Sequence, residues 1–135
     1  MVIVDSSAII AILFDEPEAL PCAAALKKAS LRLISAVNYV ETGTVLAGRI
    51  RQGDRQQAIG DLDDFLTAFG IDIAPLDEAI ARAALKARLA FGKGFRSRGG
   101  LNFGDCFAYA LAQVEGEGLL FKGDDFPQTD VKPAI

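Results

Sequence analysis

The sequence predicts an α/β fold, in which strands and helices alternate along the chain around a mainly parallel sheet. Three observations support this prediction. Short apolar runs, such as VIV at residues 2–4, have the length of buried strands. Longer segments between them place apolar residues at helical spacing, as at residues 55–69. Two residues that favour helix starts, Ser35 and Asp77, stand where a strand gives way to a helix.

The predicted elements follow one another with short connections. Strands are expected at residues 2–4, 31–35, 71–74 and 119–121, with a short last strand near Val131. Helices are expected at residues 6–14, 18–29, 36–51, 55–69 and 78–91, and again after Asn102. Pro21 either stands early in the second helix or breaks it. Gly92 ends the fifth helix and opens a loop rich in glycine and arginine.

The composition predicts one domain over residues 1–135. No apolar run approaches the ~20 residues of a membrane span, so we expect no membrane partner. The N-terminal segment lacks the basic region of a signal peptide. Cys22 and Cys106 lie far apart and without metal-type spacing, which indicates free thiols. We therefore expect a cytoplasmic protein.

The chain contains no histidine, which excludes Ser-His-Asp and Cys-His catalysis and histidine-bearing zinc sites. Acid–base and metal chemistry would fall mainly to Asp and Glu. The formal net charge is −4, so a polyanionic partner would need a local basic patch.

Several acidic residues stand at the predicted ends of strands and starts of helices. Asp5 follows the first strand, and Asp124 and Asp125 follow the fourth. Ligands of such sheets bind beyond the carboxyl ends of the strands. Each acid also has a purely structural interpretation. Asp5 could cap a helix, Asp105 could stand in the first turn after Asn102, and the Asp-Asp pair could simply form a turn.

Glu41 is the only charged residue between Leu33 and Gly48. A carboxylate in such an apolar helix costs several kcal/mol unless it is paired or binds a metal, or unless it emerges on a polar seam. Like charges about 5 Å apart repel by about 3 kcal/mol at an effective dielectric of 20. A cluster of Asp5, Glu41, Asp105 and Asp124 would therefore need a cation, and oxygen ligands favour Mg²⁺ or Mn²⁺.

Four segments of the chain resemble PIN-domain ribonucleases, specifically the VapC-type toxins of bacterial toxin–antitoxin pairs. The segments are VIVDSSAIIAILFDEP, SAVNYVET, GKGFRSRGGLNFGDCFAYALA and GLLFKGDDFPQTDV, and they follow the order and spacing of that family. The resemblance implies a three-layer α/β/α sandwich, a homodimer, Mg²⁺ or Mn²⁺ as cofactor, and an antitoxin that blocks the site. It also implies cleavage of RNA to a 5′-phosphate and a 3′-hydroxyl.

The resemblance assigns the site residue by residue. The first acid, the helix glutamate, the third acid, the fourth acid and the hydroxyl correspond to Asp5, Glu41, Asp105, Asp124 and Ser6. Asp125 could substitute for Asp124. On this interpretation Asp5, Asp105 and the fourth acid hold Mg²⁺, while Glu41 either ligates the metal or orients the attacking water.

A basic stretch precedes Asp105. Six cations and no acid lie between Arg82 and Gly104, and the last three of them are Lys93, Arg96 and Arg98. The stretch is either a solvated face or a phosphate-binding rim for RNA beside the metal site.

Two other function classes remain open from the residues. The VIVD start also occurs in aspartyl-phosphate phosphatases, although Ser7 stands where their second aspartate is usual. A catalytically silent binding module is the other. The sequence contains no motif that identifies the RNA target.

Overall fold

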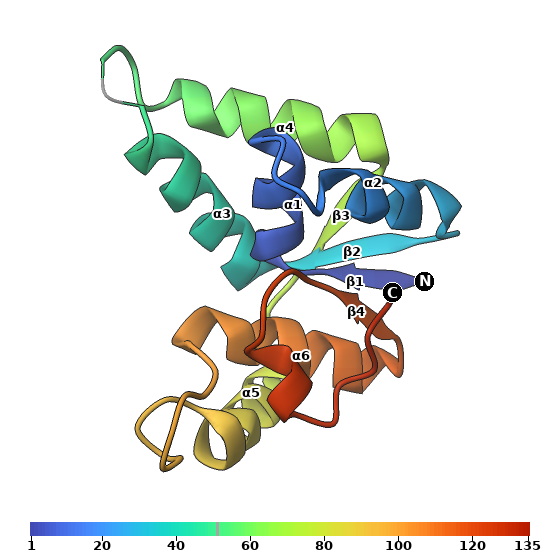
Figure 1. Cartoon of the computed structure of the whole chain (residues 1–135), viewed down its shortest axis with the longest axis vertical. Helices are drawn as coiled ribbons and strands as arrows, with labels where there is room; N and C mark the ends of the chain where they lie inside the picture. The colour runs from blue at the N-terminus through green and yellow to red at the C-terminus, as the bar shows by residue number, and fades with distance from the viewer. Residues whose placement is uncertain (51) are drawn as a thin grey trace.

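The computed structural model describes residues 1–50 and 52–135, which form a parallel sheet between two layers of helices (Figure 1). The strands are β1 (Val2–Val4), β2 (Arg32–Ser35), β3 (Ile71–Ala74) and β4 (Gly118–Leu120). They lie in the order β3-β2-β1-β4, and each neighbouring pair is parallel. The predicted α/β class, parallel sheet and three-layer sandwich are therefore confirmed.

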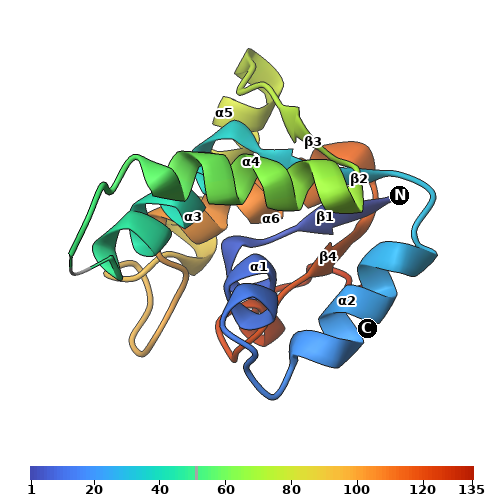
Figure 2. The ribbon, with the colours of Figure 1, turned by 90° about the horizontal axis from the view of Figure 1, so that it is seen from above.

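Alternate residues of β1, one of the two inner strands, face opposite helical layers, as a pleated strand requires. Val2 and Val4 pack with the layer of α1 to α4, whereas Ile3 packs with α5 and α6. The helices are α1 (Ser6–Leu13), α2 (Ala19–Lys28), α3 (Ala36–Gly48), α4 (Gln57–Phe69), α5 (Glu78–Phe91) and α6 (Phe103–Glu115), with a 3-10 turn at Phe126–Gln128. Figure 2 looks down on the first layer, where α1 lies beside α2 and α3 beside α4.

The predicted helix starts are confirmed by hydrogen bonds. The Ser35 hydroxyl accepts from the backbone N–H of Asn38 at 3.0 Å, and the Asp77 carboxylate accepts from that of Ile80 at 2.9 Å. Pro21 lies in the first turn of α2, where the backbone N–H has no partner within the helix, so the helix is not broken.

Two elements differ most from the prediction, and the other boundaries lie within two residues of it. The helix expected over residues 36–51 ends at Gly48, a poor helix former, and residue 51 lies outside the described residues. The short strand expected near Val131 is a single bridge between Leu119 and Pro133, and the Glu117 N–H, which could extend it, donates instead to the Ala112 carbonyl at the end of α6. None of the helices in the described ranges is long and apolar enough to cross a bilayer.

Candidate active site

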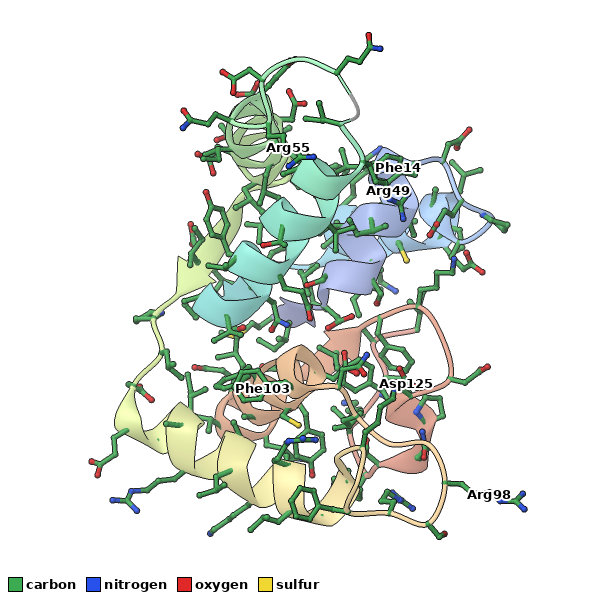
Figure 3. All side chains as sticks on the ribbon, turned by 90° about the vertical axis from the view of Figure 1, so that its left-hand side faces the viewer. Phe14, Arg49, Arg55, Arg98, Phe103 and Asp125 are labelled. Carbon is green, nitrogen blue, oxygen red and sulfur yellow. The ribbon has the colours of Figure 1, made fainter. Side chains whose placement is uncertain are left out.

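An acidic cleft of about 370 Å³ lies beyond the carboxyl ends of β1 and β4, between the starts of α1 and α6 and the middle of α3. Five acids line it: Asp5, Glu41, Asp105 and Asp125 come from four different segments, and Glu16 is the fifth. Figure 3 views the molecule from this side, with Asp125 labelled on the loop after β4. The expectation that the sheet brings distant acids into one crevice is thus met in the geometry.

Asp5 directly follows β1 and caps α1. Its Oδ2 accepts hydrogen bonds from the backbone N–H and the hydroxyl of Ser7, at 3.0 and 2.5 Å. Its Oδ1 is buried without a hydrogen-bond partner among the described residues. Burial raises the pKa of Asp5 to about 6, against the lowering effect of these bonds. The structural interpretation as a cap is therefore correct, but it accounts for only one of the two carboxylate oxygens.

Asp105 stands in the first turn of α6, where its Oδ2 accepts from the backbone N–H of Asn102 at 2.9 Å. Burial raises the pKa of Asp105 to about 7, and the negative charge of Asp5 adds to the shift. Glu41 and Asp125 raise it further, by smaller amounts. The other three acids therefore lie close enough to Asp105 to oppose its ionisation.

Glu41 projects from α3, and its carboxylate accepts hydrogen bonds from a hydroxyl and an amide group. Its Oε1 accepts from the Ser6 hydroxyl at 2.5 Å and from the Asn38 side-chain amide at 3.2 Å. A Cβ atom at Gly104 would overlap the Glu41 carboxylate, so any other residue there would require that carboxylate to move. The half-buried Glu41 is therefore fixed in place by three neighbours.

Asn38 is a site residue that the sequence analysis missed. It is fully buried, and its amide also donates to the Gly104 carbonyl at 3.0 Å, which joins α3 to α6 beneath the acids. A signal was present, because Asn38 precedes Glu41 by three residues in an apolar helix and so lies on the same helix face.

The fourth acid of the cleft is Asp125. Asp124 is exposed and does not line the cleft, although the sequence analysis placed it first. Phe126, which is buried, anchors the turn so that the residue directly before it faces the other acids.

Lys122 and Glu16 also line the cleft, and neither was singled out from the sequence. The Lys122 ammonium lies 2.9 Å from Glu16 Oε1 and 3.5 Å from a carboxylate oxygen of Glu18. Lys122 and Glu16 are 106 residues apart in the chain, so no local sequence pattern indicates that they pair.

The donors of the cleft suit a hard divalent cation. They are carboxylate oxygens, the ligands that Mg²⁺ and Mn²⁺ prefer, and the buried Asp5 Oδ1 lacks any other partner among the described residues. Over residues 1–50 and 52–135, no three acidic or thiol side chains are already close enough together to enclose an ion. Mutual repulsion and separate hydrogen bonds hold the carboxylates apart, as like charges require.

The basic loop, residues 92–100, connects α5 to the helix of Asp105. Lys93, Arg96 and Arg98 are all exposed in it, and none of the three lines the acidic cleft. The Arg96 guanidinium lies 5.7 Å from the Phe91 ring centre, while Arg98 points outward in Figure 3. The base of the loop is closed by two backbone hydrogen bonds between Leu101 and the residues at 91 and 93, at 2.8 and 2.9 Å.

Comparison with known proteins identifies the family. The PIN domain family model matches residues 2–132. The chain belongs to the PIN-domain family. It is 42% identical over 130 residues to VapC ribonuclease Mb0640 of Mycobacterium bovis, which covers 96% of this chain and 95% of the relative. Ribonuclease VapC42 of Mycobacterium tuberculosis is 42% identical over 132 residues, 98% of each chain. The resemblance to VapC-type PIN ribonucleases is therefore confirmed.

Solved VapC structures share the fold of this PIN domain. VapC20 of Mycobacterium tuberculosis, described as a Sarcin-Ricin loop cleaving toxin, has a TM-score of 0.75 at 14% identity and covers 97% of this chain and 96% of its own. The VapBC2 structure from Rickettsia felis, bound to a DNA fragment from its promoter, gives 0.71 at 17% identity, with 98% and 96% covered. At these identities the likeness shows the fold alone.

Proposed function

We propose that this VapC-family chain is a metal-dependent endoribonuclease and the toxin of a toxin–antitoxin pair. In this proposal residues 1–135 form its single nuclease domain, which acts in the cytoplasm. The observation that supports it most is the acidic cleft itself, in which burial raises the pKa values of Asp5 and Asp105; the charge of Glu41 adds to the shift of Asp5, and that of Asp5 adds to the shift of Asp105. The names of the relatives, which are ribonucleases, support the choice of RNA.

Asp5, Asp105 and Asp125 would hold Mg²⁺, with Mn²⁺ as the alternative, and Asp125 replaces Asp124 in this role because it lines the cleft. When bound, the ion would supply charge stabilisation to the phosphate oxygens of the RNA. Asn38 and Ser6 hold one oxygen of Glu41 by hydrogen bonds, which leaves the other to orient a water molecule or to bind metal. The products would be a 5′-phosphate and a 3′-hydroxyl, as the family resemblance implies.

The basic loop would contact RNA outside the cleft. Lys93, Arg96 and Arg98 are exposed on the segment that enters α6, so each can reach a phosphate without disturbing the acids. Contacts of this kind contribute affinity that depends on salt and little sequence preference.

A homodimer is part of the proposal, as the family resemblance implies. The apolar residues of the first helix, such as Ile9 and Ile10, are buried in this chain's own core. Exposed apolar side chains gather instead in a groove of about 680 Å³ beside Glu41, which is lined by Val40, Leu76 and Phe103 together with the half-buried Val37. We assign the dimer contact to this groove, with Phe103 labelled in Figure 3.

A cognate antitoxin is the second proposed protein partner. Related folds occur in a toxin–antitoxin complex from Klebsiella pneumoniae and in the VapBC2 assembly. An antitoxin arginine or lysine placed among the four acids would neutralise them in place of a metal.

Light scattering tests the dimer, because the chain alone should give about 29 kDa, twice the 14.3 kDa of one chain. Coexpression with a neighbouring antitoxin gene should give a larger complex without RNase activity.

The test of the function is metal-dependent RNA cleavage. Purified protein should cleave pooled RNA in Mg²⁺ or Mn²⁺ and stop in EDTA, and sequencing of RNA 5′ ends after induction should reveal the target. Hydrolysis of a small phosphate ester without RNA cleavage would contradict the proposal. Metal and RNA binding without cleavage would instead identify a silent binding module.

A further inference from the structure

The loop that bears Asp125 is fastened to α1 at two points, both through Lys122. The Lys122 backbone N–H donates to the Ser7 hydroxyl at 2.9 Å, and that hydroxyl donates to Asp5 Oδ2 at 2.5 Å. The Lys122 ammonium bonds to Glu16 at 2.9 Å. Lys122, which follows β4, therefore contacts both the start of α1 and the turn after its end.

The turn after α1 directs Glu16 toward this lysine at a conformational cost. Asp15 has φ of 51°, a left-handed conformation unusual for any residue but glycine. The backbone N–H of Glu16 reaches back to the Ala11 carbonyl at 2.9 Å, and that of Asp15 to Ile12 at 3.3 Å. This is the Schellman arrangement with aspartate in the position usually held by glycine. Pro17 follows and stops any return to helix.

We propose that Ser7, Lys122 and Glu16 form a clasp that positions Asp125 against Asp5 in the acidic cleft. Lys122 is a positioning residue here: both of its anchors hold the chain three residues before the acid. The alternative is a direct contact between the ammonium and an RNA phosphate. It is disfavoured because two carboxylates, Glu16 and Glu18, already surround the ammonium within 3.5 Å.

The catalytic consequence of the clasp rests on the proposed function, whereas its structural consequence does not. Hydrogen exchange of residues 122–126 and Mn²⁺ binding measured by calorimetry both need no RNA. The variants are Lys122→Ala, Lys122→Arg and the nearly isosteric Glu16→Gln, with Lys28→Ala on the exposed end of α2 as the matched control.

Lys122→Ala and Glu16→Gln should both speed exchange at residues 122–126. Each should also weaken Mn²⁺ binding and lower kcat by about 10–100-fold, the usual effect of removing a group that orients a ligand. The KM for RNA should change less than about twofold. Lys122→Arg should retain most of the Mn²⁺ affinity and kcat that Lys122→Ala loses. The double variant Lys122→Ala/Glu16→Gln should be no worse than Lys122→Ala alone, since both substitutions remove the same contact.

Two results would overturn the clasp. The first is unchanged exchange and Mn²⁺ affinity in Glu16→Gln, which stays informative even if Lys122→Ala does not fold. The second is a raised KM with a flatter salt dependence in Lys122→Ala alone, which would make Lys122 a phosphate contact. If exchange and Mn²⁺ binding shift as expected while wild-type protein leaves RNA intact, the clasp stands and the nuclease proposal fails.

Discussion

The basic loop leads directly into the helix that bears Asp105 of the acidic cleft, but the side chains of the two regions are constrained very differently. Asp5 and Asp105 stand at a strand end and a helix start, Glu41 lies in the middle of α3, and hydrogen bonds with Ser7, Asn102 and Asn38 respectively hold these three carboxylates. The cations of the loop are exposed, and backbone hydrogen bonds close the base of the loop. A rigid group can be placed for chemistry, whereas an exposed cation contributes long-range attraction that tolerates motion. The two regions should therefore respond differently to the same kinds of change.

The largest expected effect is the loss of one cleft acid. Asp105→Asn or Asp5→Asn should lower RNA cleavage by more than about 100-fold, since even a group that only orients a metal ligand can cost that much. Asparagine can still accept the capping bonds and removes a repelled charge, so without metal the variants should unfold at the same or higher urea concentration. Asp124→Asn is the matched control, because that side chain lies outside the cleft. Full cleavage by Asp105→Asn would contradict the assignment.

The second effect tests the packing of Glu41. Gly104→Ala places a methyl group on the carboxylate, so we expect about tenfold or greater loss of cleavage and a free energy of unfolding lower by about 1–3 kcal/mol. Gly60→Ala, on an exposed part of α4 with open space around it, should instead stabilise the protein by roughly 0.5–1 kcal/mol. Equal behaviour of the two alanines, in cleavage assays and urea titrations, would mean that Glu41 has room to move.

The third effect is a pH dependence confined to the cleft. Asp5 and Asp105 have folded-state pKa values of about 6 and 7, above 3.8, so the folded chain binds more protons than the unfolded chain between about pH 4 and 7. Without metal, stability should fall by several kcal/mol in total as pH rises through this window, since each pKa unit corresponds to about 1.4 kcal/mol, and Mg²⁺ should remove much of the fall. Cleavage should rise over the same window as the acids ionise.

Urea titrations from pH 4 to 8 with and without Mg²⁺ measure this dependence. Asp105→Asn should flatten the metal-free profile, whereas the exposed cations of the basic loop have no part in it. A profile that rises with pH in the absence of metal would show that the two acids are not destabilised by burial.

The sequence predicts the cleft better than its details, for reasons visible in particular residues. Asp5 and the acids after the fourth strand could be placed together because the carboxyl ends of parallel strands share one edge of the sheet, whereas Asp105 was placed with them through the family resemblance. Asn38 could have been identified from the sequence, as a polar residue on the same helix face as Glu41. The pairing of Lys122 with Glu16 was not, because it depends on tertiary contact between segments 106 residues apart.

The choice between Asp124 and Asp125 depends on turn geometry that the residue types leave open. Gly123, with φ of 109°, reverses the chain, and burial of Phe126 then decides which acid faces inward. The apolar groove near Phe103 could not be located from the sequence for a similar reason. An apolar helix such as α1 indicates burial, but not whether its own core or a partner covers it.

The smallest effect belongs to the basic loop and separates it most clearly from the cleft. Replacing Lys93, Arg96 and Arg98 with alanine should weaken RNA binding, and lower the slope of log affinity against log salt by about 2, since each phosphate contact with single-stranded RNA contributes about 0.7. Mn²⁺ affinity and the metal-free pH profile should stay unchanged, because none of the three side chains lines the cleft. Fluorescence anisotropy with labelled RNA between 50 and 200 mM salt, using Asp105→Asn as the background to prevent cleavage, measures the slope. If slope and affinity are unchanged, the loop is a solvated surface; if Mn²⁺ affinity falls as well, the loop shapes the cleft and the two regions are not independent.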